Sequence, residues 1–122
     1  MKSILELQAQ VLEEIAIELG KSALQNYEDW VEVFYETCLD EQGVGADRTI
    51  VRNGNERQDI FPAHAVSECS TKLSQLRPRL PGEMWSRLTI RVKRSGEVDV
   101  EYGYEEDPFE KFYEDWEHHR PF

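Results

Sequence analysis

The last residues of the chain contain the side chains best suited to bind a metal. Asp115, His118 and His119 follow one another at helical spacing, and a carboxylate three or four residues from a histidine can share a metal ion with it. No third ligand is evident, because the remaining His64 lies far away in the sequence, and chain ends fray. The sequence therefore predicts neither a metal site nor a cofactor. A small metal-dependent enzyme built on these residues remains an alternative.

Glu105, Glu106 and Asp107 are consecutive carboxylates that could suggest acid–base catalysis. Such catalysis needs environments that split the pKa values of a pair of acids, whereas a run of acids entering a helix cap is typical of a solvated face. Nucleophilic catalysis needs Ser or Cys beside a positioned His, and phosphate binding needs a glycine-rich turn between a strand and a helix. The sequence contains neither pattern. We predict that the chain is not an enzyme.

The length and charge of the chain define its class. A chain of 122 residues is expected to form a single domain, residues 1–122, with one modest core. It has 25 acidic and 14 basic residues, a net charge of −11 and 39% hydrophobic residues, which is enough apolar surface to fold. An acidic surface repels phosphate backbones and attracts basic proteins. We expect a basic protein partner and no direct binding to nucleic acid.

The acidic and basic residues are unevenly distributed. Residues 1–47 hold 11 acidic and 2 basic residues (net −9), residues 48–96 hold 4 and 10 (net +6), and residues 97–122 hold 10 and 2 (net −8). Two acidic blocks therefore flank a basic middle. Any interpretation of the function must account for this layout.

Cys38 and Cys69 are the only cysteines, and the first residues lack the basic segment and continuous apolar run of a signal peptide. Two thiols in such a chain are expected to be free and buried, in a reducing cytoplasm. No segment approaches the ~18 apolar residues of a membrane helix. We therefore expect a cytoplasmic protein without a membrane partner.

The first half of the chain predicts a helix and a strand. Residues 4–19 carry apolar side chains at helical spacing, with Ser3 and Glu6 at capping-box spacing and Gly20 as a natural stop. Residues 30–38 alternate like a strand. One face of this strand is mixed, and we expect it to be only partly covered. That face carries Trp30, Glu32, Phe34 and Glu36.

The middle of the chain predicts a short strand and a second helix. Residues 48–52 resemble a strand and residues 53–55 form a turn. Pro62 opens a helix that must end near Arg77, because two prolines follow.

Residues 84–116 hold the most informative pattern, in which a basic strand turns into an acidic aromatic strand and then into an aromatic helix. A two-residue turn would set Val92 against Asp99. A three-residue loop sets Val92 against Val98 and Ile90 against Val100, which matches apolar residues across the hairpin. We predict the second register.

This register has two further consequences. Gly96 is expected to supply the left-handed position of the loop. Arg91 falls opposite Asp99, and Lys93 falls opposite Glu97, so much of the basic charge is compensated within the hairpin. The carboxylates at 105–107 are then the freer charges.

Asp107 is expected to cap a last helix, with Pro108 in its first turn and Glu110 at capping-box spacing. Phe109, Phe112, Tyr113 and Trp116 then share one face. The predicted order is helix, strand, strand, helix, strand, strand, helix. This order indicates an α+β fold, with an antiparallel sheet of about four strands and helices packed on one face.

The segments 85–90, 95–96, 98–102 and 104–105, followed by Pro108-Phe109 and Trp116, together resemble the YezG-like immunity proteins. In that family a Trp precedes an apolar strand, a glycine turn, an acidic aromatic strand and a closing helix with Trp. The resemblance covers about the last third of the chain. It implies an α+β antitoxin that protects a bacterial cell from a toxin domain, often a nuclease, delivered by neighbouring cells. The family has no catalytic residues to carry over.

We therefore expect an immunity protein that binds a cognate, basic toxin domain and covers its active or substrate-binding surface. The sequence leaves open which surface is covered, the oligomeric state, and whether residues 87–94 touch the toxin. The alternative is an acidic adaptor or chaperone-like module for a basic client. The predicted partner-binding residues are Glu101, Glu105, Glu106, Asp107 and Glu110, with Glu28, Asp29, Glu32 and Glu36 as a second acidic patch.

Overall fold

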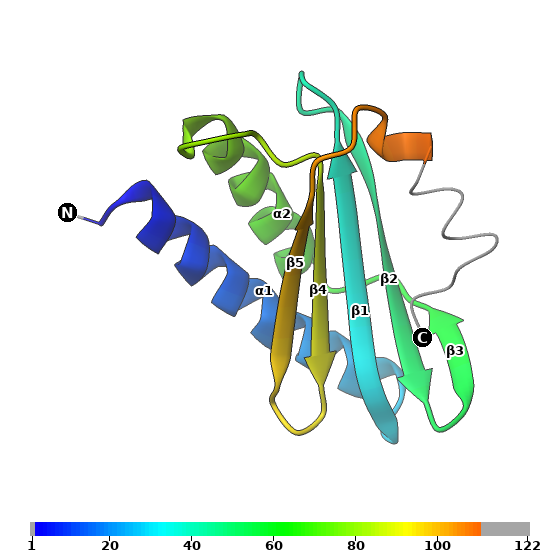
Figure 1. Cartoon of the computed structure of the whole chain (residues 1–122). Helices are drawn as coiled ribbons and strands as arrows, with labels where there is room; N and C mark the ends of the chain where they lie inside the picture. Colours follow the sequence, from blue (N-terminus) through cyan, green and yellow to red (C-terminus); the bar gives the residue numbers. More distant parts are fainter. Residues whose placement is uncertain (1, 111–122) are drawn as a thin grey trace.

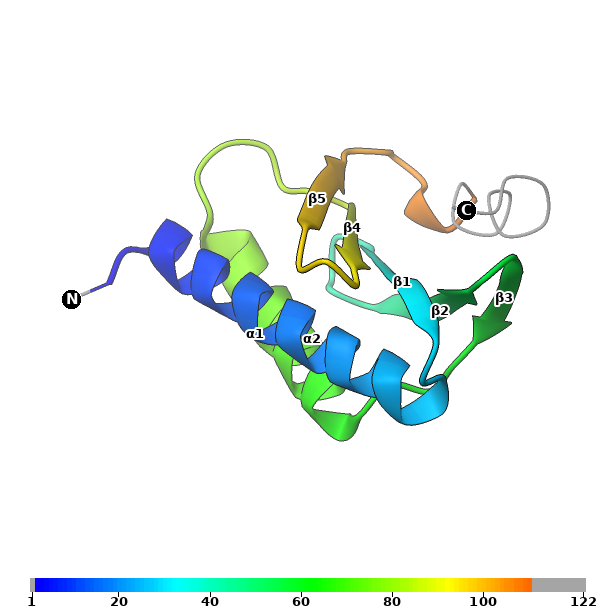
Figure 2. The same cartoon turned by 90° about the horizontal axis from the view of Figure 1, so that it is seen from below.

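The computed structural model describes residues 2–110. Its elements are α1 (Ile4–Asn26), β1 (Trp30–Leu39), β2 (Gly45–Asn53), β3 (Glu56–Asp59), α2 (His64–Leu76), the short 3-10 helix η1 (Arg77–Arg79), β4 (Arg87–Lys93) and β5 (Val98–Gly103). The strands form one antiparallel sheet in the order β3-β2-β1-β4-β5. Both helices pack on the same face of this sheet, as Figures 1 and 2 show. The predicted α+β class and the one-sided helix packing are confirmed.

The helix α1 begins as predicted and ends later than predicted. The Glu6 amide donates to Ser3 Oγ at 3.1 Å, so Ser3 caps the helix. The predicted stop at Gly20 is wrong, because the helix continues to Asn26 and buries Ala23 completely. A glycine weakens a helix by only about 1 kcal/mol. Burial of another apolar turn outweighs that penalty.

The sheet contains five strands instead of about four. The additional strand, β3, follows a turn in which Gly54 takes a φ of 61°. The predicted turn chemistry at residues 53–55 is therefore confirmed, but β3 itself carries only charged and polar side chains and gives no apolar alternation to recognise. The helix α2 begins at His64, two residues after Pro62, and is followed by η1 at Arg77.

The β4–β5 hairpin has the predicted register. Val92 pairs with Val98, and Ile90 pairs with Val100. Gly96 has a φ of 97°, which the loop requires of its left-handed residue. The Lys93 ammonium lies 3.3 Å from the Glu97 carboxylate.

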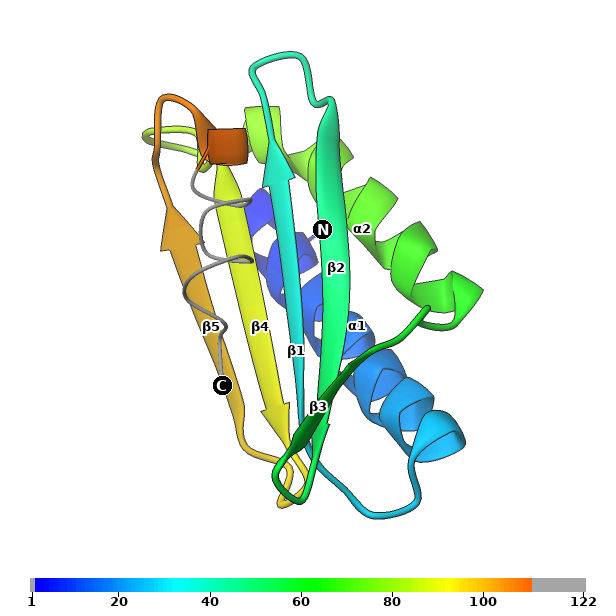
Figure 3. The ribbon, with the colours of Figure 1, turned by 90° about the vertical axis from the view of Figure 1, so that its right-hand side faces the viewer.

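The core lies between the sheet and the two helices. β1 and β4 contribute fully buried apolar side chains, among them Val33, Leu88 and Ile90, and these meet Ile15 and Leu19 from α1. β1 is the central strand and is buried along almost its whole length. The sheet thus separates a helix-covered apolar face from a second face, which is turned toward the viewer in Figure 3.

The last predicted helix lies mostly outside the described residues. Residues 108–110 are helical, and the Glu110 amide donates to Asp107 Oδ1 at 3.2 Å. The predicted capping by Asp107 is therefore confirmed. The predicted aromatic face of Phe112, Tyr113 and Trp116, and the alternative metal ligands Asp115, His118 and His119, lie outside the described residues.

Candidate functional site: a carboxylate-rich pocket at one end of the sheet

Three loops meet at the end of the sheet where β1 and β5 finish and β4 begins. Because β1 and β5 each run antiparallel to β4, their carboxyl ends lie at the same edge of the sheet. The loop after β1, the loop before β4 and the segment after β5 line a pocket of about 510 Å³. Figure 1 shows these connections together at the top of the sheet.

Five carboxylates line this pocket, and they come from all three loops. The members are Asp40, Glu41, Glu83, Glu105 and Glu106. The sequence predicted Glu105 and Glu106 as partner-binding residues, and the structure places both at this site. Asp40, Glu41 and Glu83 were not predicted, because their proximity depends on the tertiary fold. Leu39, Met84, Tyr104 and Pro108 supply the apolar part of the lining.

Two of the five carboxylates have structural roles. Asp40 Oδ1 accepts hydrogen bonds from the amides of Gln42 and Val44, both at 2.9 Å. The Glu105 carboxylate lies 3.5 Å from Arg87 Nη2 and accepts a hydrogen bond from Ser86 Oγ at 3.3 Å. These contacts hold the loop and the segment after β5 in place.

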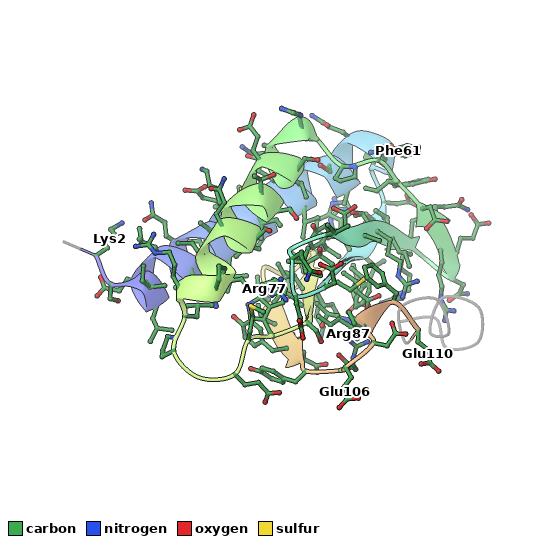
Figure 4. The ribbon with its side chains drawn as sticks, turned by 90° about the horizontal axis from the view of Figure 1, so that it is seen from above. Lys2, Phe61, Arg77, Arg87, Glu106 and Glu110 are labelled. Atoms are coloured by element: carbon green, nitrogen blue, oxygen red, sulfur yellow. The ribbon has the colours of Figure 1, made fainter. Side chains whose placement is uncertain are left out.

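Glu41, Glu83 and Glu106 are the exposed carboxylates of the pocket. Figure 4 shows Glu106 at the rim, on the same side of the molecule as Arg87 and Glu110. Within residues 2–110 no ion pair involves these three acids. They are therefore the side chains best placed to receive a cation from outside.

Arg77 forms the inner wall of the pocket and is 3% exposed. Its Nε donates to the Trp85 carbonyl at 2.6 Å, and its Nη2 donates to the carbonyls of Asp40 at 2.8 Å and Leu39 at 3.4 Å. Its guanidinium also lies over the Trp85 ring, 5.4 Å from the centroid. Burial lowers the pKa of Arg77. Arg77 thus ties the loop before β4 to the end of β1.

Glu32 and Glu36 were predicted to be a displayed acidic patch, and their placement corrects that prediction. Both are buried, on the sheet face opposite the helices. Glu36 lies 2.6 Å from Arg48 Nη2 and 3.3 Å from Arg87 Nη1, and Glu32 lies 3.1 Å from Arg52 Nη2. The long arginine side chains from β2 and β4 fold over β1. The mixed face of β1 at Glu32 and Glu36 is therefore covered, where the sequence predicted partial exposure. Trp30 was assigned to this face wrongly, because an irregularity in the pairing between Trp30 and Glu32 places Trp30 in the helix-side core.

These ion pairs explain much of the basic middle of the chain. Arg48, Arg52 and Arg87 neutralise carboxylates of the first and last blocks. Arg91 pairs in register with Asp99, as predicted, and lies over the Phe34 ring at 5.7 Å. Most basic residues of the middle block thus form contacts within the protein, whereas acidic residues remain exposed on the loops and on the outer surface of the helices.

The remaining predicted acids do not join one surface. Glu101 is exposed on β5 and Glu110 is exposed beside the pocket. Glu28 and Asp29 are exposed just before β1 begins, at the opposite end of that strand. Ten strand residues span roughly 30 Å. The two predicted acidic patches are therefore separate.

Within residues 2–110 no group of three His, Cys, Asp or Glu side chains is arranged to hold a metal ion. Cys38 and Cys69 are free and buried, as predicted, and burial raises the pKa of both thiols. A search of the same residues for helices that could cross a membrane finds none.

Comparison of the whole chain with models of known protein families gives no match, and comparison with curated proteins gives none either.

Proposed function

We propose that this chain is a cytoplasmic immunity protein that binds and neutralises a basic toxin domain, with the carboxylate-rich pocket as its recognition site. The observation that carries the proposal is the convergence of five carboxylates from three loops on one pocket. Three of them are exposed. A nuclease presents Lys and Arg to phosphate, so an acidic site of this kind is complementary to its substrate-binding surface.

The pocket combines steering with anchoring. The net charge of −11 accelerates the approach of a basic partner. Tyr104, which is 51% exposed, and the apolar lining by Met84 then offer contacts that a guanidinium or the stem of a lysine can use. A lysine or arginine of the toxin would enter among Glu41, Glu83 and Glu106. A cation engaged in this way is withdrawn from nucleic acid.

The first experiment is genetic. An immunity protein is expected to be encoded beside its toxin, so the toxin domain to test is the variable C-terminal domain encoded by the adjacent upstream gene. Co-expression of this chain should rescue cells that produce that domain. If cells die at the same rate with and without the chain, the proposal is wrong.

The second experiment tests the pocket itself. The double variant Glu41→Lys, Glu106→Lys reverses two exposed charges at the rim, and the double variant Glu56→Lys, Glu68→Lys makes the same charge change on β3 and α2. Both variants alter long-range steering equally. The rim variant should bind the toxin at least about tenfold more weakly than the control, with a shallower dependence of affinity on salt. Equal affinities for the two variants would show that the toxin binds outside the carboxylate-rich pocket.

The same measurements distinguish the adaptor alternative. An adaptor for basic clients would bind several unrelated basic proteins at low salt and lose them all at high salt. An immunity protein would bind one toxin tightly in both conditions.

A further inference from the structure

A second surface lies along β5, at the edge of the sheet next to α1. An apolar groove of about 530 Å³ runs between these two elements. Trp30 and Val92 form its buried floor, Leu12 and Ile17 line the α1 side, and Val98 and Val100 line the β5 side. Ile17 is 53% exposed and Val98 is 43% exposed. The groove therefore presents several apolar side chains together.

The groove exists because the helix layer stops short of β5. α1 packs mainly against α2, β1 and β4, and Figure 2 shows β5 at the side of the sheet away from α2. The helix-facing side chains of β5 are therefore covered on the side toward β4 and open toward the edge of the sheet. The hydrogen bond from Gln8 Nε2 to Tyr102 Oη, at 2.9 Å, joins α1 to β5 near the end of the groove.

The outer edge of β5 also offers backbone groups. In the described part of the chain β5 pairs with β4 alone. The Lys93 amide donates to the Glu97 carbonyl at 2.9 Å. Bonded and non-bonded pairs alternate along an antiparallel ladder, so the amides and carbonyls of Val98 and Val100 point away from β4. An extended segment laid beside β5 would find these groups unpaired.

The charges around this edge select the segment. On the other face of β5, Asp99 and Glu101 are exposed, and Glu101 stands opposite Thr89, which carries no charge. Glu13 lies at the α1 rim of the groove. Lys93 and Arg94 also line the groove, but Lys93 pairs with the Glu97 carboxylate and Arg94 donates to the carbonyls of Glu28 and Trp30. A strand added here would place one set of alternate side chains in the apolar groove and the other set beside Asp99 and Glu101.

A second copy of this chain is a poor occupant. An antiparallel pair of β5 strands centred on Val100 would set Asp99 of one copy against Glu101 of the other, and like charges directly opposite destabilise a pair. Each copy also carries a net charge of −11, which opposes self-association.

We propose that β5 binds an extended segment of a basic protein as a sixth strand, with alternate apolar residues in the groove and alternate Lys or Arg residues beside Asp99 and Glu101. The choice of a basic protein rests on the proposed function. The strand addition itself rests on the groove, the unpaired edge and the carboxylates.

The test uses a peptide probe and does not require a toxin. The probe is a seven-residue peptide, acetylated and amidated, that alternates lysine and valine, and its counterpart alternates glutamate and valine. The lysine peptide should shift the NMR amide signals of Val98, Val100 and Leu12 and slow hydrogen exchange at Val100. No binding up to about 1 mM, equal binding of the glutamate peptide, or shifts confined to residues 104–110 would overturn the proposal.

A matched pair of variants tests the backbone contact. Val100→Pro removes the outward amide without removing a bond to β4, and edge strands tolerate proline at such positions. Val100→Thr keeps the amide and the β-branched shape. We expect the proline variant to bind the lysine peptide about tenfold more weakly, as loss of one backbone hydrogen bond predicts, and the threonine variant to bind like the parent. Circular dichroism and a thermal melt establish that both are folded, and an unaltered affinity in folded Val100→Pro contradicts strand addition.

The outcomes separate this inference from the proposed function. A toxin that binds Val100→Pro normally but loses affinity for Glu41→Lys, Glu106→Lys would refute the β5 site and leave the pocket standing. A chain that binds the lysine peptide at β5 but rescues no cell would leave the β5 site standing and refute immunity. A lysine peptide that shifts Leu12 and Ile17 without protecting the Val100 amide would bind through the apolar groove alone, which would also refute strand addition.

Discussion

Arg87 Nη1 on β4 lies 3.3 Å from Glu36 Oε2 on the central strand β1. Glu36 Oε1 also forms an ion pair with Arg48 Nη2 at 2.6 Å. The second terminal nitrogen of Arg87, Nη2, lies 3.5 Å from Glu105 Oε1. One chain of ion pairs therefore runs from β2 through β1 and β4 to the rim of the carboxylate-rich pocket. The stability of the sheet and the position of Glu105 are linked through Arg87.

Removal of the central acid should destabilise the protein. Glu36 is 1% exposed, and Glu36→Ala leaves two half-buried arginines without their shared carboxylate. We expect the free energy of unfolding to fall by about 3–5 kcal/mol, measured by urea denaturation. Glu36→Gln keeps an acceptor oxygen and should lose less. Glu56→Ala, at the exposed first position of β3, should change stability by no more than about 0.5 kcal/mol. A loss of that small size for Glu36→Ala would show that the network contributes little.

Arg77→Lys tests the inner wall of the pocket. A lysine cannot reproduce the fork that reaches the carbonyls of Trp85 and Asp40, so we expect a loss of about 2–3 kcal/mol. Arg79→Lys is the control, because Arg79 is exposed in the same short helix. Thermal denaturation of both variants provides the comparison. Similar melting temperatures would mean that Arg77 stabilises the fold through packing of its aliphatic carbons and not through the hydrogen bonds of its guanidinium.

Tyr35 should make the protein sensitive to alkali. Its hydroxyl donates to Ser70 Oγ at 2.9 Å or Asp47 Oδ2 at 3.1 Å, and burial, followed by the Asp47 charge, raises the pKa of Tyr35 above its ordinary value. The folded protein then holds this proton to a higher pH than the unfolded chain. Stability is therefore complete below about pH 10, the ordinary pKa of tyrosine, and falls as pH rises further.

Tyr35→Phe makes this effect measurable. At pH 7 the variant should be about 1 kcal/mol less stable than the parent, because a buried hydrogen bond is lost. At pH 11 the difference in stability between variant and parent should narrow. At that pH Tyr35 ionises in the unfolded parent, which lowers the stability of the parent alone because phenylalanine does not titrate. Urea denaturation at both pH values measures the difference, and Tyr104→Phe is an exposed control. A gap that stays constant between the two pH values would contradict the assignment.

Two glycines should respond in opposite directions to alanine. A Cβ at Gly45 would lie 1.9 Å from the Cys38 carbonyl oxygen, whereas a Cβ at Gly20 meets nothing within 4 Å. Gly45→Ala should therefore push β2 away from β1 and lower the melting temperature. Gly20→Ala should stabilise α1 by up to about 1 kcal/mol. Differential scanning calorimetry of both variants checks the signs, and a stabilising Gly45→Ala would mean that the loop before β2 yields easily.

The elements that the sequence predicts correctly are those in which the spacing of apolar residues is compatible with only one secondary structure or one strand pairing. The β4–β5 register is the clearest case, because only one pairing sets Val92 against Val98. The end of α1 was wrong because the local preference of Gly20 was weighted above the burial of Ala23. β3 was missed because its pairing with β2, and not its own polar side chains, makes it a strand.

The site was only partly predictable for a related reason. Charge patterning identified Glu105 and Glu106, which are adjacent in the chain. Alternation in β1 assigned Glu32 and Glu36 to the correct face, but it could not show that arginines from β2 and β4 cover that face. Asp40 and Glu83 join the pocket through connections far apart in sequence. The backbone contacts of Arg77 gave no signal in the sequence beyond a basic helix end.

The contacts of Arg77 have a consequence for the amount of this protein in a cell. Because its guanidinium gathers carbonyls from separate segments of the chain, the pocket disappears when the chain unfolds. A ligand that binds only the folded form protects it, by about 2.7 kcal/mol at a concentration one hundred times its dissociation constant. Proteases that digest unfolded chains would then remove mainly the copies without a ligand. Turnover would adjust the supply of this protein to the supply of its ligand, without any change in gene expression.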